Sequence, residues 1–358
     1  MELLSVTMND GVIPRSEIEG KDNSSEDKSN YKIVLKGDMV YNSMRMWQGA
    51  NGISPCDGIV SPAYTVLMPK TLINNGYFAA LFKSPNLINE FRKNSQGMTS
   101  DTWNLKYPQI ETIKVCIPSL TEQERIANML GTLERRITKQ ALLVDSLKKY
   151  KRGVIQRIFR QTAAQEGEVW TCVRLGEAFK KVSRRNTNGS VKNVITNSAE
   201  YGLIPQRDFF DKDIAVDGNT ANYYIIEKGD FVYNPRKSNT APYGPFNRYT
   251  LSEQGIISPL YTCLVLKADI NPSYLAWYFR SDAWHRYIYD NGSQGVRHDR
   301  VSMTDDLLMG IPVMFPDHTK QQAYADILDK IETRLQATQK EYELLVSMKD
   351  GYMQQLFI

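Results

Sequence analysis

The chain has 358 residues, of which 42% are hydrophobic and 23% charged, and its formal net charge is +4. This length suits two ordinary domains with their own cores, and the composition excludes a largely disordered chain. No apolar run approaches the roughly 20 residues of a membrane-spanning helix, and the first residues lack a secretory signal pattern. Four isolated cysteines and only three histidines argue against a structural zinc site. We therefore expect a metal-free protein of the reducing cytoplasm.

The chain repeats its own sequence at a distance of about 190 to 200 residues. Lys36–Asn42 returns as Lys228–Asn234, and in both copies Lys-Gly-Asp before an apolar run predicts a turn that leads into a buried strand. Short β-favouring runs separated by Gly, Pro and Asn predict a strand-rich domain in each copy. A short helix is expected after each set of strands, around Gly76–Phe82 and Ser273–Tyr287. A duplicated unit of this kind suits the reading of two sites on one extended ligand.

A long helix is predicted after each strand-rich copy. Thr121 with Glu124 and Thr319 with Gln322 suggest capping pairs at the two helix starts. Apolar residues then recur in the 4-3 rhythm of a coiled coil, and polar residues interrupt both stripes at matching places. In the first helix the stripe is Ile126, Leu130, Leu133, Ile137, Val144, Leu147, Val154 and Ile158, with Gln140 and Lys151 matching Thr338 and Lys349 of the second.

The two helices are expected to pair with each other. A helix of about 40 residues is about 60 Å long, which is more than one small domain covers. Residues 121–160 carry ten basic and four acidic residues (+6), and residues 316–358 carry five and seven (−2), so their charges favour pairing. An antiparallel pair would place one strand-rich unit at each end and hold them apart by between one and two turns of duplex.

Polar loops follow the strands, and they differ between the two copies. Arg and Lys suit guanine edges or phosphates, and Asn and Gln suit adenine edges, so these loops are candidates for DNA contact. The candidate residues are Arg45, Gln48, Asn51, Lys93, Asn94 and Gln96 in the first copy, and Arg236, Lys237, Ser238, Asn239, Arg248, Arg297, His298 and Arg300 in the second.

Motifs of catalysis are missing from the sequence. There is no phosphate-binding loop for ATP hydrolysis and no glycine-rich dinucleotide fingerprint. Asn234-Pro235-Arg236 begins like the motif of amino-methyltransferases but lacks its second proline and its aromatic residue. Glu19-Gly20-Lys21 matches only half of a nuclease site. We therefore expect neither catalytic nor metal-binding residues.

The chain resembles the specificity (S) subunit of type I restriction–modification systems. The resemblance is strongest at Ile117–Ile126 and along the helix to Phe159, and Trp170–Glu177 looks like the opening of the family's second domain. It implies an α+β fold with two strand-rich target-recognition domains, each followed by a long helix, the helices pairing as an antiparallel coiled coil. The expected boundaries are 1–117 for the first domain, 118–161 for the central helix, 162–168 for a linker, 169–315 for the second domain and 316–358 for the last helix.

The resemblance also implies a function. The chain would be the non-catalytic subunit that reads a split DNA sequence. It would dock two methyltransferase subunits that bind S-adenosylmethionine, with ATP- and Mg-dependent restriction and motor subunits completing the complex. It would itself hold no cofactor and have no membrane partner. Outer helix residues such as Arg135, Arg136, Lys148 and Lys149 would face these partners.

Two alternatives remain open from the sequence. The chain is expected to have a shortened first domain, because the second copy carries about 25 residues, 169–193, before its match to Leu3–Leu4. A missing strand would expose a sheet edge, so the chain could instead be an assembly scaffold that reads no sequence. A specificity subunit of a combined methyltransferase–nuclease system is the other alternative.

Overall fold

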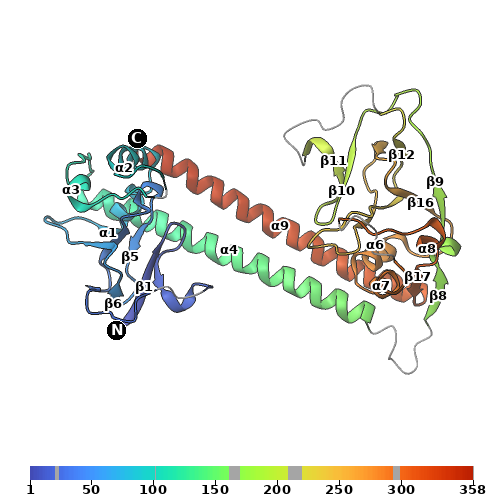
Figure 1. The fold of residues 1–358 in the computed structure, drawn as a ribbon, viewed down its shortest axis with the longest axis horizontal. Helices are drawn as coiled ribbons and strands as arrows, with labels where there is room; N and C mark the ends of the chain where they lie inside the picture. The colour runs from blue at the N-terminus through green and yellow to red at the C-terminus, as the bar shows by residue number, and fades with distance from the viewer. Residues whose placement is uncertain (21–23, 101, 161–169, 209–219, 293–298, 358) are drawn as a thin grey trace. The chain divides into compact units, whose positions relative to one another are not determined.

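The computed structural model describes residues 1–20, 24–100, 102–160, 170–208, 220–292 and 299–357 (Figure 1). The chain divides into two compact units: unit 1 comprises Met1–Val144 with Ala337–Ile358, and unit 2 comprises Asp145–Gln336. Each unit therefore contains a strand-rich region and a part of both long helices. The expected α+β class, with a long helix after each strand-rich region, is confirmed. Among the described helices, none has the length and apolar character needed to span a bilayer.

Unit 1 contains two small sheets. In the first, β1 pairs antiparallel with β2 and parallel with β6, which also pairs with β3; in the second, β4 lies between β5 and β7. The predicted turn before a buried strand is confirmed, because Gly37 has a φ of 92° and Val40 and Tyr41 are fully buried. The strands are β1 Glu2–Thr7, β2 Gly11–Pro14, β3 Lys32–Val34, β4 Met39–Asn42, β5 Asn51–Ile53, β6 Gly58–Val60 and β7 Tyr64–Leu67.

Short helices follow the strands of unit 1 and pack its core against the long helices. Phe91 of α2 is buried in the same cluster as Leu130 of α4 and Phe357, which follows the end of α9. The helix predicted around Gly76–Phe82 is α1, whose N-cap Asn74 accepts the backbone N–H of Tyr77. The helices are η1 Arg15–Glu17, η2 Met46–Gln48, α1 Asn75–Leu81, α2 Pro85–Asn94, α3 Tyr107–Ile110 and α4 Leu120–Arg160.

Unit 2 repeats this arrangement with additional strands. Its central sheet has the order β14-β13-β16-β9, so β9 covers the edge of β16; the equivalent strand β7 of unit 1 pairs only with β4 among the described residues. The strands are β8 Thr171–Arg174, β9 Phe179–Val182, β10 Ile195–Ser198, β11 Gly202–Pro205, β12 Tyr224–Ile226, β13 Phe231–Tyr233, β14 Phe246–Arg248, β15 Gly255–Ile257, β16 Thr262–Leu266 and β17 Pro312–Phe315.

The short helix predicted around Ser273–Tyr287 is two helices, α6 and α7. The chain leaves the helical conformation at Ser281, whose hydroxyl donates to the carbonyl of Tyr278 at 2.6 Å. Serine in this position competes for backbone hydrogen bonds, which explains why the apolar pattern alone predicted one helix. The helices of unit 2 are α5 Leu175–Ala178, η4 Gln206–Asp208, α6 Pro272–Arg280, α7 His285–Asn291, α8 Asp305–Met309 and α9 His318–Leu356.

The long helices begin at Leu120 and His318, so the predicted caps Thr121 and Thr319 lie inside the helices and are wrong. Ser119 accepts the N–H of Glu122 at 3.4 Å, and Asp317 accepts the N–H of Lys320 at 3.0 Å. Sequence reasoning favoured the threonines because an acidic or amide residue follows each at the spacing of a capping box.

A glutamine joins each long helix to the short helix beside it. In unit 1 the Gln123 side chain accepts the N–H of Asn74 at 3.0 Å and donates to the carbonyl of Pro118 at 2.9 Å. In unit 2 Gln321 accepts the N–H of Asn271 at 2.8 Å and donates to Pro316 at 2.8 Å. Both glutamines are buried.

The long helices pack against each other in opposite directions within each unit. In unit 1 Lys349 pairs with Glu134 at 2.8 Å, and Gln140 donates to the carbonyl of Thr338 at 3.1 Å. In unit 2 Lys151 pairs with Glu332 at 2.8 Å. The side chains of Gln140, Lys151 and Lys349, which interrupt the predicted stripes, therefore each have a partner on the facing helix.

Candidate DNA-recognition loops

In unit 1 the loop between β4 and β5 is anchored by a buried side chain and exposes polar residues to solvent. Met46 is fully buried, and Gly49 turns the chain with a φ of 82°, so this short segment has a defined shape. Arg45 precedes the turn, and its carbonyl accepts the N–H of Gln48 at 3.0 Å. The Arg45 side chain is exposed and Gln48 is half-buried, which leaves both available to a ligand.

Aromatic rings bring this loop together with the end of α2. Trp47 meets Trp103 edge to face at 5.1 Å, and the Arg92 guanidinium lies 5.7 Å from the Trp47 ring centre. Lys93, next to Arg92, pairs with Glu90 at 2.7 Å. Arg92 belongs to the basic loop that the sequence indicates at Arg92-Lys93-Asn94 with Gln96, whereas Trp103 was not expected as a site residue.

Two other candidates lie beside this group. Asn94 is half-buried and donates to the carbonyl of Glu90 at 2.9 Å, so it caps the end of α2. Gln96 is exposed, and its backbone pairs with Asn104. We name Arg45, Gln48, Arg92, Lys93 and Gln96 around Trp47 the unit 1 loop group.

Asn51 does not belong to this exposed surface. Its side chain has 0% exposure, and its amide donates to the carbonyl of Gly49 at 3.1 Å. Its Oδ1 has no hydrogen-bond partner in the part of the chain that the structure describes. The prediction treated it as a loop residue, whereas it is the first residue of β5. A buried amide in this place cannot reach a DNA base.

In unit 2 two arginines face each other across a short stretch of paired backbone. Arg236 and Arg300 form an antiparallel bridge, which is extended by Lys237 N–H donating to Asp299 at 2.8 Å. Burial raises the pKa of Tyr261, and the nearby Arg236 and Arg300 charges oppose that rise. Tyr261 was not among the predicted site residues. We name Arg236, Arg300 and Tyr261, with Lys237, the unit 2 loop group; Arg297 and His298 lie outside the described residues.

A hollow of about 480 Å³ adjoins the unit 2 loop group. Lys237, Ser238 and Asn239 line one side of it, and Tyr243 and Tyr289 contribute aromatic surface. The Ser238 hydroxyl accepts the N–H of Ala241 at 3.1 Å, so it shapes the turn. Asn239 is exposed. The hollow combines donors with ring faces, which is the chemistry that contacts bases and phosphates.

Arg248 lies apart from this group. It pairs across the sheet with Phe231, five residues before Arg236, which corresponds to about 16 Å along an extended strand. Its Nη1 donates to Ser273 of α6 at 3.4 Å, and its buried Nε has no partner within the described ranges. Burial lowers the pKa of Arg248, and the Asp329 carboxylate of α9 opposes that shift. Arg248 is therefore a half-buried residue near α9 that lies outside the unit 2 loop group.

The repeated strand-rich units and their helices match known proteins. Residues 5–144 match a family model described as the type I restriction modification DNA specificity domain. The type I restriction enzyme MjaVIII specificity subunit of Methanocaldococcus jannaschii is 22% identical over 353 residues, which cover 91% of this chain and 79% of that protein. Residues 5–144 thus carry the DNA specificity domain of type I restriction–modification systems.

Solved structures of type I restriction-modification proteins share the fold of this chain. The S subunit of a type I restriction-modification system from M. genitalium has a TM-score of 0.59 at 14% identity, over 99% of this chain and 94% of that one. A chain from a structural study of type I R-M complex assembly and conformational transition has a TM-score of 0.53 at 17% identity, over 93% and 84%. Specificity subunits are the non-catalytic members of type I systems, and S-adenosylmethionine and ATP are bound by the partner subunits.

Proposed function

We propose that this type I specificity subunit reads a bipartite DNA sequence, one half through the loop group of each unit, and that the paired helices set the unread gap. It would assemble with methyltransferase and restriction subunits in the cytoplasm. The main support is a difference between the two copies of the repeat: the strands recur, whereas the polar and aromatic residues at their ends differ. Two different readers on one scaffold suit a target with two different halves.

The charges of the loop groups support contact with duplex DNA. Arg45 and Arg92 stand around Trp47 in unit 1, and Arg236 faces Arg300 in unit 2. Arginines attract the phosphate backbone and also donate in pairs to guanine in the major groove. The chain's net charge is only +4, so these local groups, rather than the overall charge, would position the duplex.

The helices support docking of the partner subunits. Leu142, Leu143 and Tyr150 of α4 and Leu344 and Met348 of α9 are exposed apolar side chains on the long helices. Exposed apolar residues rimmed by charge are typical of protein interfaces. We propose the outer helix faces, including Arg135, Arg136, Lys148 and Lys149, as the surface for the methyltransferase subunits.

Methylation mapping tests this function in cells that express the chain with its methyltransferase partner. The natural chain should give a motif with two defined halves. Arg236→Ala with Arg300→Ala should relax one half, and Arg45→Ala with Gln48→Ala the other, so each variant keeps an internal control in its unaltered half. Arg248→Ala should leave both halves intact if the protein folds. Changes confined to one and the same half, or no change at all, would contradict the proposal; methyltransferase binding without any site preference would favour the scaffold alternative.

A further inference from the structure

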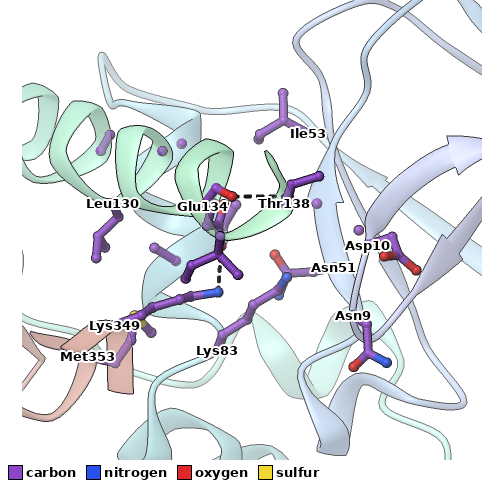
Figure 2. Close-up of a pocket in the computed structure, with 18 of the residues that line it drawn as sticks. Asn9, Asp10, Asn51, Ile53, Lys83, Leu130, Glu134, Thr138, Lys349 and Met353 are labelled. Carbon is purple, nitrogen blue, oxygen red and sulfur yellow. Dashed lines mark hydrogen bonds and ion pairs between the residues drawn. The ribbon is translucent and has the colours of Figure 1, made fainter. Parts of the chain in front are cut away.

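Unit 1 contains a cavity of about 1110 Å³ between α1, β5 and the two long helices. Figure 2 shows Asn51, Lys83, Glu134 and Lys349 around it, with Lys349 joined to Glu134. Ala80 and Gly131 also line it, so part of its wall is formed by very small side chains. We call this cavity, defined by Asn51, Ala80, Lys83, Gly131, Glu134 and Lys349, the unit 1 socket.

Unit 2 repeats the framework around the socket. In unit 1 the Tyr77 ring of α1 meets Phe357 with centroids 5.5 Å apart and planes at 55°. In unit 2 the Tyr274 ring of α6 meets Phe159 at 5.6 Å and 55°. The Lys349–Glu134 pair likewise recurs as Lys151–Glu332, each at 2.8 Å. The two units can therefore be compared position by position along α1 and α6 and along the starts of α4 and α9.

In unit 2 large side chains stand where the socket has small ones. Trp277 takes the position of Ala80, and Asp329 takes that of Gly131. The Trp277 Nε1 donates to the Asp329 carboxylate at 2.7 Å. Arg280, at the position of Lys83, lies 5.0 Å from the Trp277 ring centre. In unit 2 the Trp277 ring thus occupies this place, hydrogen-bonded to the Asp329 carboxylate and in contact with the Arg280 cation.

Unit 1 keeps the cation but has Ala80 and Gly131 in the places of the ring and of the carboxylate that holds it. Among the described residues the structure gives the Lys83 ammonium no hydrogen bond or ion pair. Burial lowers the pKa of Lys83, and the Glu134 and Asp10 carboxylates oppose that shift. The Asn51 Oδ1 in the socket wall also has no hydrogen-bond partner among the residues that the structure describes, and the residue has 0% exposure. Unpaired buried polar groups cost free energy that a ligand can recover. In unit 2 the equivalent cation, Arg280, lies against an aromatic ring that donates to a carboxylate.

We propose that the unit 1 socket binds a segment of the methyltransferase partner that carries an aromatic side chain beside a carboxylate, in the places that Trp277 and Asp329 fill in unit 2. This rests on the proposed assembly with methyltransferase subunits. The socket opens beside both long helices and is larger than one side chain needs, which suits a length of polypeptide. A buried aromatic anchor within a larger interface is also the usual source of binding energy between proteins.

The direct test fills the socket with the side chains of unit 2. Ala80→Trp with Gly131→Asp should fit, because a Cβ at Gly131 meets nothing closer than Arg135 Nη1 at 3.9 Å. The purified full-length variant should melt at or above the natural temperature. It should bind the purified methyltransferase subunit about tenfold or more weakly in titration calorimetry, as loss of an anchoring contact predicts. Indole-3-acetate, as a probe of the aromatic and acidic chemistry, should give saturation-transfer signals with the natural chain and not with the variant.

A second variant keeps the proposal testable if the filled chain fails to fold. Lys83→Gln removes the cation but keeps a polar, unbranched side chain only one atom shorter, and it should weaken methyltransferase binding several-fold. Lys70→Gln, an exposed control in the same unit, should not. Unchanged methyltransferase affinity in the folded filled chain, or in Lys83→Gln, would overturn the proposal. If the natural chain itself bound no methyltransferase subunit, the proposed function would fail instead.

Discussion

Replacing Phe159 with alanine should destabilise unit 2 by about 4 kcal/mol. Phe159 lies in the last turn of α4 and is 1% exposed, with the rings of Tyr274 and Tyr278 centred 5.6 and 5.7 Å away. Loss of a core phenylalanine costs about 3–5 kcal/mol, and ring pairs contribute about 0.5–1.5 kcal/mol beyond buried area. We use the upper half of this range because the two tyrosines cannot move into the cavity that the lost ring leaves. Their hydroxyls donate to the carbonyls of Met314 and Pro312, which hold both rings in place.

Denaturant unfolding followed by circular dichroism measures this loss. Tyr150→Ala is the matched control, because Tyr150 is on the same helix but 58% exposed, and it should change the free energy of unfolding by less than about 0.5 kcal/mol. A loss below about 1 kcal/mol for Phe159→Ala would show that the end of α4 is not part of the core of unit 2, which would refute the packing described here.

Three further outcomes follow from the structure. One heptad can be deleted from each helix by removing residues 138–144 and 338–344, which shortens each helix by about 10 Å. This deletion should shorten the unread gap in the methylated motif by about 3 base pairs, and an unchanged gap would show that the helices do not set the spacing. If both arginines contact phosphates, Arg236→Ala with Arg300→Ala should lower the slope of log affinity against log salt by about 2. Fluorescence anisotropy between 50 and 200 mM salt measures this slope, and an unchanged slope would show that the two arginines do not contact the DNA backbone. Burial lowers the pKa of His285 in the folded chain. As the pH falls, the unfolded chain therefore binds the proton at a higher pH than the folded chain does. The stability that neutral His285 contributes is fully present above about pH 6.5 and is lost as the pH falls towards the folded pKa. Melting temperatures between pH 5 and 8 should therefore fall less steeply on acidification in His285→Gln, and parallel curves would contradict this assignment.

The larger features of the fold could be predicted because they depend on patterns that repeat along the sequence. The heptad rhythm predicted two long helices, and the recurrence of Gln140 and Lys151 as Thr338 and Lys349 indicated matched polar places in the seam. The structure gives Gln140 and both lysines partners on the facing helix. Such periodic signals survive local variation because many residues carry them together.

The candidate site was less accessible because it depends on which residues converge in space. Asn51 and Arg248 have the side chains expected of readers, yet one is buried in a strand and the other faces the long helix. Conversely, Trp103 and Tyr261 lie far along the chain from Trp47 and Arg236, and only tertiary folding brings each pair together. The type of a single residue does not predict which residues from other parts of the chain will lie beside it.

The glutamine joints at the two helix starts make the strand-rich segments interchangeable in principle. Gln123 and Gln321 each satisfy one amide of the preceding short helix and one carbonyl of the chain before their own helix, with the same atoms. A recombinant in which one segment replaced the other upstream of this joint would inherit a complete set of polar partners there. New pairings of recognition modules could thus arise by exchange of coding sequence, without any compensating substitution at the splice.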